Sequence, residues 1–177
     1  MIGKTNSNIF STVARPSRLP KPADPPRTTN LTHKTAAQEP FQPLMRSLVT
    51  SYQAFYSYAD KHIRSLGLTL PQFDVIVTLG NTDGMLMNEL AEKTLVTKGT
   101  LTGIVDRLEQ KDYVRREIPP NNRRCFRVVL TAQGEALFKQ IFPAHIEYLK
   151  DRFDRLSPTE LAAVKAAFDQ LRDLFAD

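Results

Sequence analysis

The sequence predicts a mainly α-helical chain that carries one small β-hairpin, and three observations support this fold class. Apolar residues recur every three or four positions in several long stretches, which is the period of a helix with one buried face. Two short strand-like stretches between residues 113 and 130 flank a Pro-Asn turn, and the second alternates polar and apolar side chains, which is typical of a hairpin. The 177 residues are 41% hydrophobic and 24% charged, as expected for one globular domain with a tail.

The first 40 residues differ in composition from the rest of the chain. They contain six of the twelve prolines and six Lys or Arg against two acidic residues, and their apolar residues have no period. We expect residues 1–40 to form a disordered, Pro-rich basic arm and residues 41–177 to form the folded domain. The arm has three interpretations: an ordinary disordered leader, a basic segment that adds non-specific affinity for nucleic acid, or a targeting segment.

The folded domain should begin with two helices. The apolar stripe of residues 41–66 predicts a long amphipathic helix that ends at Gly67. Thr69 and Pro71 then suit the N-cap and the first turn of a second helix, which should end at Gly80.

A polar turn at 81–84 leads to a short helix at about 87–94 and, after a tight connection, to a helix at about 98–111. The stretches 113–118 and 124–130, on either side of the turn, predict the two strands of the hairpin. A short helix, a tight turn and a second helix make a helix-turn-helix, and a hairpin directly after it makes the motif winged.

Two further helices should complete the chain. Thr131 suits the N-cap of the first, which we expect Pro143 to kink or break. The last helix has a strong start, with Ser157 as N-cap, Pro158 in the first position and Glu160 three residues after the cap.

The helix at 98–111 has the two faces expected of a DNA recognition helix. One face carries the apolar residues that should pack on the domain, and the other carries small and polar residues near the N-terminal end, where such helices meet base edges. The glycines on that face would allow close approach to DNA or would simply be tolerated by solvent. The residues assigned to DNA here are Thr97, Lys98, Gly99, Thr100, Thr102, Gly103 and Arg107.

The hairpin supplies a second candidate contact, because residues 98–130 carry eight Lys or Arg against four acidic residues. Arg123 and Arg124 lie at its turn, where a cation can enter a minor groove. Arg115, Arg116 and Arg127 lie on its strands and suit contact with phosphates. Asp106 and Glu109 should instead serve local ion pairing.

Five short motifs follow one another at distances that resemble one known family. They are Leu70-Pro71-Gln72-Phe73, Glu89-Leu90-Ala91, the stretch 101–109, Asn121-Asn122-Arg123-Arg124 and the stretch 130–134. Residues 41–177 thereby resemble the MarR family of winged-helix transcription regulators, named for multiple antibiotic resistance. The resemblance implies a DNA-binding core at about 69–130, flanked by dimerisation helices at about 41–66 and 131–175.

The resemblance also implies partners. It implies a homodimer, most often a repressor, that binds a pseudo-palindromic operator on double-stranded DNA with the recognition helix in the major groove and the wing in the minor groove. A small, often phenolic ligand releases DNA in many members, and aromatic residues at 52–58 are candidates to line an effector pocket or to form core.

This chain departs from the family pattern at three positions. Asn122 stands where an Asp usually precedes the paired arginines, so the wing arginines lose a charged hydrogen bond. Asp112 replaces the glycine after the recognition helix, and a left-handed turn suits Asp less well than Gly. Gly103 stands where many members carry an Arg.

Other classes of protein are disfavoured. No run of about 20 apolar residues exists that could form a membrane-spanning helix, and no secretory signal is visible. One cysteine and three scattered histidines predict no structural metal site and a reducing cytoplasm. The sequence shows no phosphate loop, no paired carboxylates and no nucleophile triad, so we expect no enzyme, no catalytic residues and no cofactor.

Two alternatives stay open at this point. The winged helix could bind an acidic protein partner instead of DNA. Cys125 could also act as a thiol redox sensor, because neighbouring arginines would favour its thiolate, although an inert strand cysteine is the simpler interpretation.

Overall fold

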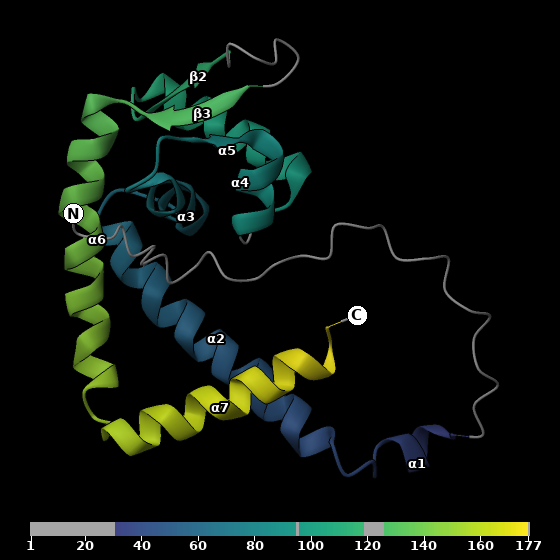
Figure 1. The fold of residues 1–177 in the computed structure, drawn as a ribbon. Coiled ribbons are helices and arrows are strands. Elements are labelled where there is room, and N and C mark those ends of the chain that lie inside the picture. The colour runs from purple at the N-terminus through teal and green to yellow at the C-terminus, as the bar shows by residue number, and fades with distance from the viewer. Residues whose placement is uncertain (1–30, 95, 119–125, 177) are drawn as a thin grey trace.

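The computed structural model describes residues 31–94, 96–118 and 126–176. Its element order confirms the predicted fold class, a mainly helical chain with a small antiparallel sheet (Figure 1). The elements are α1 (His33–Ala36), α2 (Gln42–Ser65), α3 (Leu70–Leu79), β1 (Met85–Leu86), α4 (Met87–Lys93), α5 (Lys98–Gln110), β2 (Val114–Glu117), β3 (Arg127–Leu130), α6 (Ala132–Phe153) and α7 (Pro158–Leu174).

Helix α3 lies at the centre of the core. Nine of its ten residues are buried, including the polar Asp74 and Thr78, whereas an ordinary surface helix buries one stripe. It packs against α2, α4, α5, α6 and β3. We call the part from α3 to β3 the winged-helix core.

Within the described residues the sheet has three strands, one more than the hairpin that the sequence predicts. Its order is β1-β3-β2, with Met85 opposite Val128 and Glu117 opposite Arg127. Gly84 allows β1 to approach, because a Cβ at this position, where φ is +91°, would collide with the side chain of Val129. A strand of two residues is too short to show a period in the sequence.

The hairpin strands are shorter than predicted, since the described ladder ends at Glu117 on one side and begins at Arg127 on the other. The predicted turn at 119–122, together with Arg123, Arg124 and Cys125, lies outside the described residues.

The sequence predicts that Pro143 kinks or breaks α6, and the structure shows that the helix is not broken there. The helix continues from Ala132 to Phe153 with Pro143 inside it. Proline removes one hydrogen bond, that to the carbonyl of Lys139. Buried residues on both sides, Phe138 and Leu149 among them, hold the two halves against the core, and this packing offsets the lost bond.

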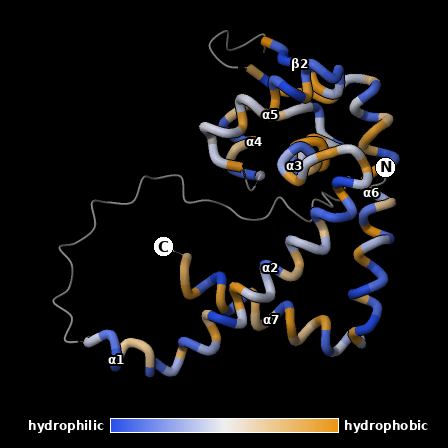
Figure 2. The backbone as a smooth tube through the Cα atoms, turned by 180° about the vertical axis from the view of Figure 1, so that it is seen from behind, coloured by the Kyte–Doolittle hydropathy of each residue, from blue (hydrophilic) through white to orange (hydrophobic). Residues whose placement is uncertain are grey.

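Helices α2, α6 and α7 extend beyond the winged-helix core, and we call them the frame (Figure 1). Apolar segments recur along α2 and α7 in Figure 2. No residue of α7 is buried, although Leu161, Val164 and Phe168 make one side of it apolar. In the described part of the chain, no helix is long and apolar enough to cross a membrane.

The end of the predicted arm differs from expectation. Residues 33–36 form the single turn α1, because the side chains and backbones of Thr32 and Thr35 bond each other reciprocally at its start. Residues 1–30 lie outside the described part.

Gly134 should be irreplaceable for stability. A Cβ there would overlap the backbone carbonyl of Tyr113, which accepts a hydrogen bond of 3.1 Å from the amide of Thr131. We expect Gly134→Ala to lower the free energy of unfolding by about 1–3 kcal/mol, measured by urea denaturation. The matched control is Gly103→Ala, where a Cβ meets nothing within 4 Å; it should stabilise by up to about 1 kcal/mol. Equal effects of the two substitutions would contradict this account.

Candidate nucleic-acid interface

The turn before α5 fixes where this helix begins. The backbone of Thr97 is extended, with φ −69° and ψ 149°, and the first helical hydrogen bond runs from the amide of Leu101 to the carbonyl of Thr97. The hydroxyls of Thr97 and Thr100 lie 2.9 Å apart and bond each other. Both residues are exposed at the N-terminal end of the helix.

Helix α5 has the two faces that the sequence predicts. Leu101, Ile104, Val105 and Leu108 are at most 3% exposed and attach the helix to the core. The opposite side is open, since Gly99, Thr100, Thr102 and Arg107 are exposed and Gly103 is partly exposed. A Cβ on either glycine would meet nothing within 4 Å, so a ligand can approach the backbone there. The side chain of Lys98 lies outside the described part of the chain.

Arg116 does not point outward as a phosphate contact would. Its guanidinium bridges two carboxylates of α5, with Nη2 2.5 Å from Oδ1 of Asp106 and Nη1 2.5 Å from Oε2 of Glu109. Its backbone amide donates a further hydrogen bond of 3.1 Å to Glu109. The side chain is 21% exposed. Arg116 therefore ties β2 to α5.

This bridge clarifies the role of the two acidic residues of α5. The prediction that Asp106 and Glu109 serve ion pairing holds, but their partner comes from the next strand. The sequence contains a signal for this bridge, because two carboxylates one helical turn apart fit the planar guanidinium of one arginine. Periodicity alone could not show that β2 returns alongside α5.

The other described arginines of the hairpin are exposed. Arg115 has a side chain that is 55% exposed and pairs with Glu117 at 2.6 Å. Arg127 lies opposite Glu117 on β3. Because β2 packs against α5 and pairs with β3, the strands that carry these two cations lie beside the helix that carries Arg107. Arg123 and Arg124, assigned to the minor groove, lie outside the described residues.

A left-handed backbone conformation at Asp112 and the hydrogen bonds around it fix the link between α5 and β2. Asp112 has φ +55°, the left-handed conformation that its position after the helix requires. Its amide bonds the carbonyl of Glu109 at 2.9 Å, and its own carbonyl accepts a hydrogen bond of 2.5 Å from the hydroxyl of Thr131. The same hydroxyl accepts from the amide of Gly134 at the start of α6. One threonine thus joins the recognition helix to the frame.

Among the described residues, no group of three or more His, Cys, Asp or Glu side chains comes together in a way that could hold a metal ion.

Comparison with known proteins agrees with this geometry. Residues 68–126 match the MarR family. The regulator MhqR of Bacillus subtilis, an HTH-type transcriptional regulator, is 30% identical over 114 residues, which are 64% of this chain and 79% of MhqR.

Solved structures give the same result. AbsC, a MarR family transcriptional regulator from Streptomyces coelicolor, is similar with a TM-score of 0.68 and 26% identity over 82% of this chain and 97% of AbsC. A mutant MarR from E. coli, complexed with operator DNA, has a TM-score of 0.67 and 25% identity over 74% of this chain and 94% of that one. The chain therefore belongs to the MarR family of DNA-binding transcription regulators, which bind DNA and catalyse no reaction.

Proposed function

We propose that this regulator is a homodimeric repressor that binds a pseudo-palindromic operator, with α5 in the major groove and the hairpin in the flanking minor groove. The observation that carries the proposal is the open N-terminal face of α5, where Gly99, Thr100 and Thr102 are exposed and uncovered. In a helix-turn-helix this end of the second helix reads base edges.

The contacts divide by chemistry. The turn and the start of α5, residues 97–103, would meet base edges and the phosphates beside them, because free backbone amides at a helix start favour anions. Arg107, Arg115 and Arg127 would neutralise phosphates. Arg123 and Arg124 would enter the minor groove. Arg116 is left out of this list, because its guanidinium bridges two carboxylates of α5 and is largely covered, whereas Arg115 pairs with one carboxylate and is exposed.

The frame supports a dimer. The exposed apolar residues of α2 and α7 exceed what scattered surface residues explain. They are Leu44, Met45, Leu48, Val49, Tyr52, Phe55 and Tyr56 of α2 and Leu161, Val164, Phe168 and Leu174 of α7. A second copy would cover both helices through one twofold interface and would supply the second recognition helix of a palindromic site.

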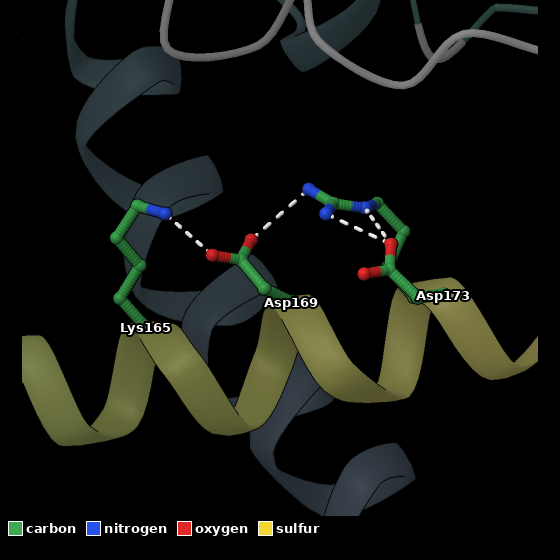
Figure 3. Close-up of polar contacts among 4 residues, drawn as sticks. Lys165, Asp169 and Asp173 are labelled. Atoms are coloured by element: carbon green, nitrogen blue, oxygen red, sulfur yellow. Dashed lines mark hydrogen bonds and ion pairs between the residues drawn. The ribbon is translucent and has the colours of Figure 1, made fainter.

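The polar side of α7 is satisfied within the helix itself. Lys165 pairs with Asp169 at 2.5 Å, Asp169 with Arg172 at 3.0 Å, and Arg172 with Asp173 at 2.9 Å (Figure 3). Its apolar side is therefore the part of α7 that needs a partner, and the part that a second copy would cover.

A small aromatic effector remains a prediction from the family resemblance. Of the candidate aromatic residues, Tyr58 packs on α6 against Tyr148, with ring centroids 4.4 Å apart. Tyr52, Phe55 and Tyr56 are exposed on the face assigned to the dimer. An effector would therefore act at or near the frame.

As a DNA-binding regulator without a membrane-spanning helix in its described part, the protein would work in the cytoplasm.

The proposal is tested by titrating DNA from immediately upstream of the protein's own gene at 150 mM salt, against random DNA of equal length. A preference of about 100-fold or more supports a sequence-specific regulator. Equal affinity for both DNAs, repeated with fragments selected genome-wide, would contradict it and favour a protein partner.

The wing arginines should act through phosphate and groove electrostatics. We expect the double substitution Arg123→Ala and Arg124→Ala to weaken binding to all DNA and to reduce the slope of log affinity against log salt by about one to two units. Fluorescence anisotropy at four salt concentrations measures both. An unchanged slope and affinity would exclude the wing as a contact.

Alanine substitutions of the neighbours Arg116 and Arg115 should have different effects on stability and on DNA binding. Arg116→Ala removes the bridge to Asp106 and Glu109, so it should lower the free energy of unfolding by about 1–2 kcal/mol and weaken DNA binding with little change in salt slope. Arg115→Ala, the matched control, should leave stability unchanged and reduce the slope by about one unit. The reverse pattern would show that Arg116 is the phosphate contact.

The apolar side of α7 should control assembly. Phe168→Asp puts a charge on that side and should convert the dimer to monomers in sedimentation equilibrium, with loss of operator binding. Ala166→Asp adds the same charge to the opposite, exposed side and should leave the dimer intact. Dissociation by both variants, or by neither, would refute this interface.

A further inference from the structure

A column of stacked side chains joins α2 to α6. The guanidinium of Arg152 lies 4.9 Å from the centre of the Tyr58 ring, and Tyr58 stacks on Tyr148 with centroids 4.4 Å apart. Tyr148 stacks in turn on His62 at 4.2 Å. The hydroxyl of Tyr58 also donates a hydrogen bond of 3.2 Å to the backbone carbonyl of Tyr148. The column therefore leads from the surface of the frame to a histidine.

This histidine is one of a pair. The Nδ1 atoms of His62 and His145 lie 3.0 Å apart, within hydrogen-bond distance. His145 is fully buried, and its ring meets Phe73 of α3 edge-on, with centroids 4.8 Å apart. A hydrogen bond between two imidazole nitrogens requires one to carry a proton and the other to present a lone pair.

Only one of the two facing Nδ1 atoms can carry a proton in this arrangement. If both rings are protonated, two N–H groups and two positive charges face each other across 3.0 Å. Burial and, to a smaller extent, the charge of His62 together lower the pKa of His145 to about 4. Burial also lowers the pKa of His62.

The position of the pair connects it to DNA reading. It lies where α2, α6 and α3 meet, and α3 packs directly against α5. In a dimer the frame would set the distance between the two recognition helices, and a two-part DNA site requires that distance to be fixed.

We propose that the His62–His145 pair is a proton-sensitive joint between the frame and the winged-helix core, which loosens on acidification and thereby lowers the affinity for DNA. The proposal rests on the function proposed above and adds a mode of regulation to it.

Each of the three helices that meet at the joint carries charged residues. On α2, Asp60 is bound to Arg64 at 2.5 Å. On α6, Asp151 pairs with Arg155 at 3.3 Å, while Tyr148 and Arg152 belong to the stacked column. On α3, the side chain of Asp74 is buried beside Phe73 in sequence. The ion pairs of the frame carboxylates thus run to arginines of their own helices.

The direction of the pH effect follows from linkage. In an opened joint, His145 would bind a proton at its ordinary pKa of 6.5, whereas in the closed joint its pKa is about 4. Closure is therefore fully favoured above pH 6.5 and is lost as pH falls from there toward 4. Between pH 7.5 and 5.5 the opening equilibrium should rise by about tenfold for this group alone.

The first test follows the three imidazoles of the native full-length chain by NMR between pH 8 and 5. His33 is exposed on α1 and serves as the internal reference. We expect the His145 ring to be neutral at pH 7.5 and to take up a proton below pH 6.5 as it loses its contacts with His62 and Phe73. A His145 ring that is still neutral at pH 5, or one that is protonated while these contacts persist, would overturn the proposal, whatever the DNA results.

The second test measures affinity for selected DNA at pH 7.5 and 5.5 and constant ionic strength. The native chain and the control His33→Asn should lose about threefold to tenfold more affinity at pH 5.5 than His145→Phe, which keeps a ring against Phe73 but cannot titrate. His145→Asn, which keeps a hydrogen-bonding group near the Nδ1 position, is the second variant in case His145→Phe does not fold.

The outcomes separate the two proposals. If no DNA is bound selectively at pH 7.5, the proposed function itself fails. If selective binding is present but its pH dependence is the same in the native chain and in the His145 variants, the function stands and the joint is refuted.

Discussion

Helix α3 can be stable only when other elements surround it, because nine of its ten residues are buried and no side of the helix faces water. Its neighbours must therefore assemble around it on all sides. The frame covers it through α2 and α6, and α5, the helix proposed to read DNA, covers it from another side. This constraint places the proposed DNA-reading helix and two helices of the frame against the same ten residues.

The surface of α5 follows from that burial. Once Leu101, Ile104, Val105 and Leu108 pack on the core, the residues between them must face outward. Two further links keep the face in a fixed orientation. Arg116 ties the hairpin to α5 through two carboxylates, and the hydroxyl of Thr131 ties the end of the α5 turn to the start of α6. Helix α5, strand β2 and the frame thus form one connected unit.

Local signals predicted much of this arrangement. The caps of α3 and α7 could be read because their partners are three residues apart, as with Ser157 and Glu160. The buried stripe of α5 was equally visible as a period. The described structure leaves Arg123 and Arg124 untested as contacts.

The sequence analysis missed features that depend on contacts between residues far apart in the chain. The continuity of α6 through Pro143 depends on packing against the core, and β1 depends on pairing with β3 more than 40 residues away. The inward direction of Arg116 and the contact between His62 and His145 have the same origin, because 83 positions separate the two histidines. A one-dimensional pattern marks which residues are polar, but it does not show which of them meet.

The central claim is that the frames of two copies together hold two winged-helix cores at a fixed spacing on DNA. A hydroxyl-radical footprint on the selected DNA tests it most directly. The account predicts two protected segments related by twofold symmetry, with centres about 10 base pairs or a small multiple of this apart. A single protected segment, or uniform weak protection along the fragment, would contradict it.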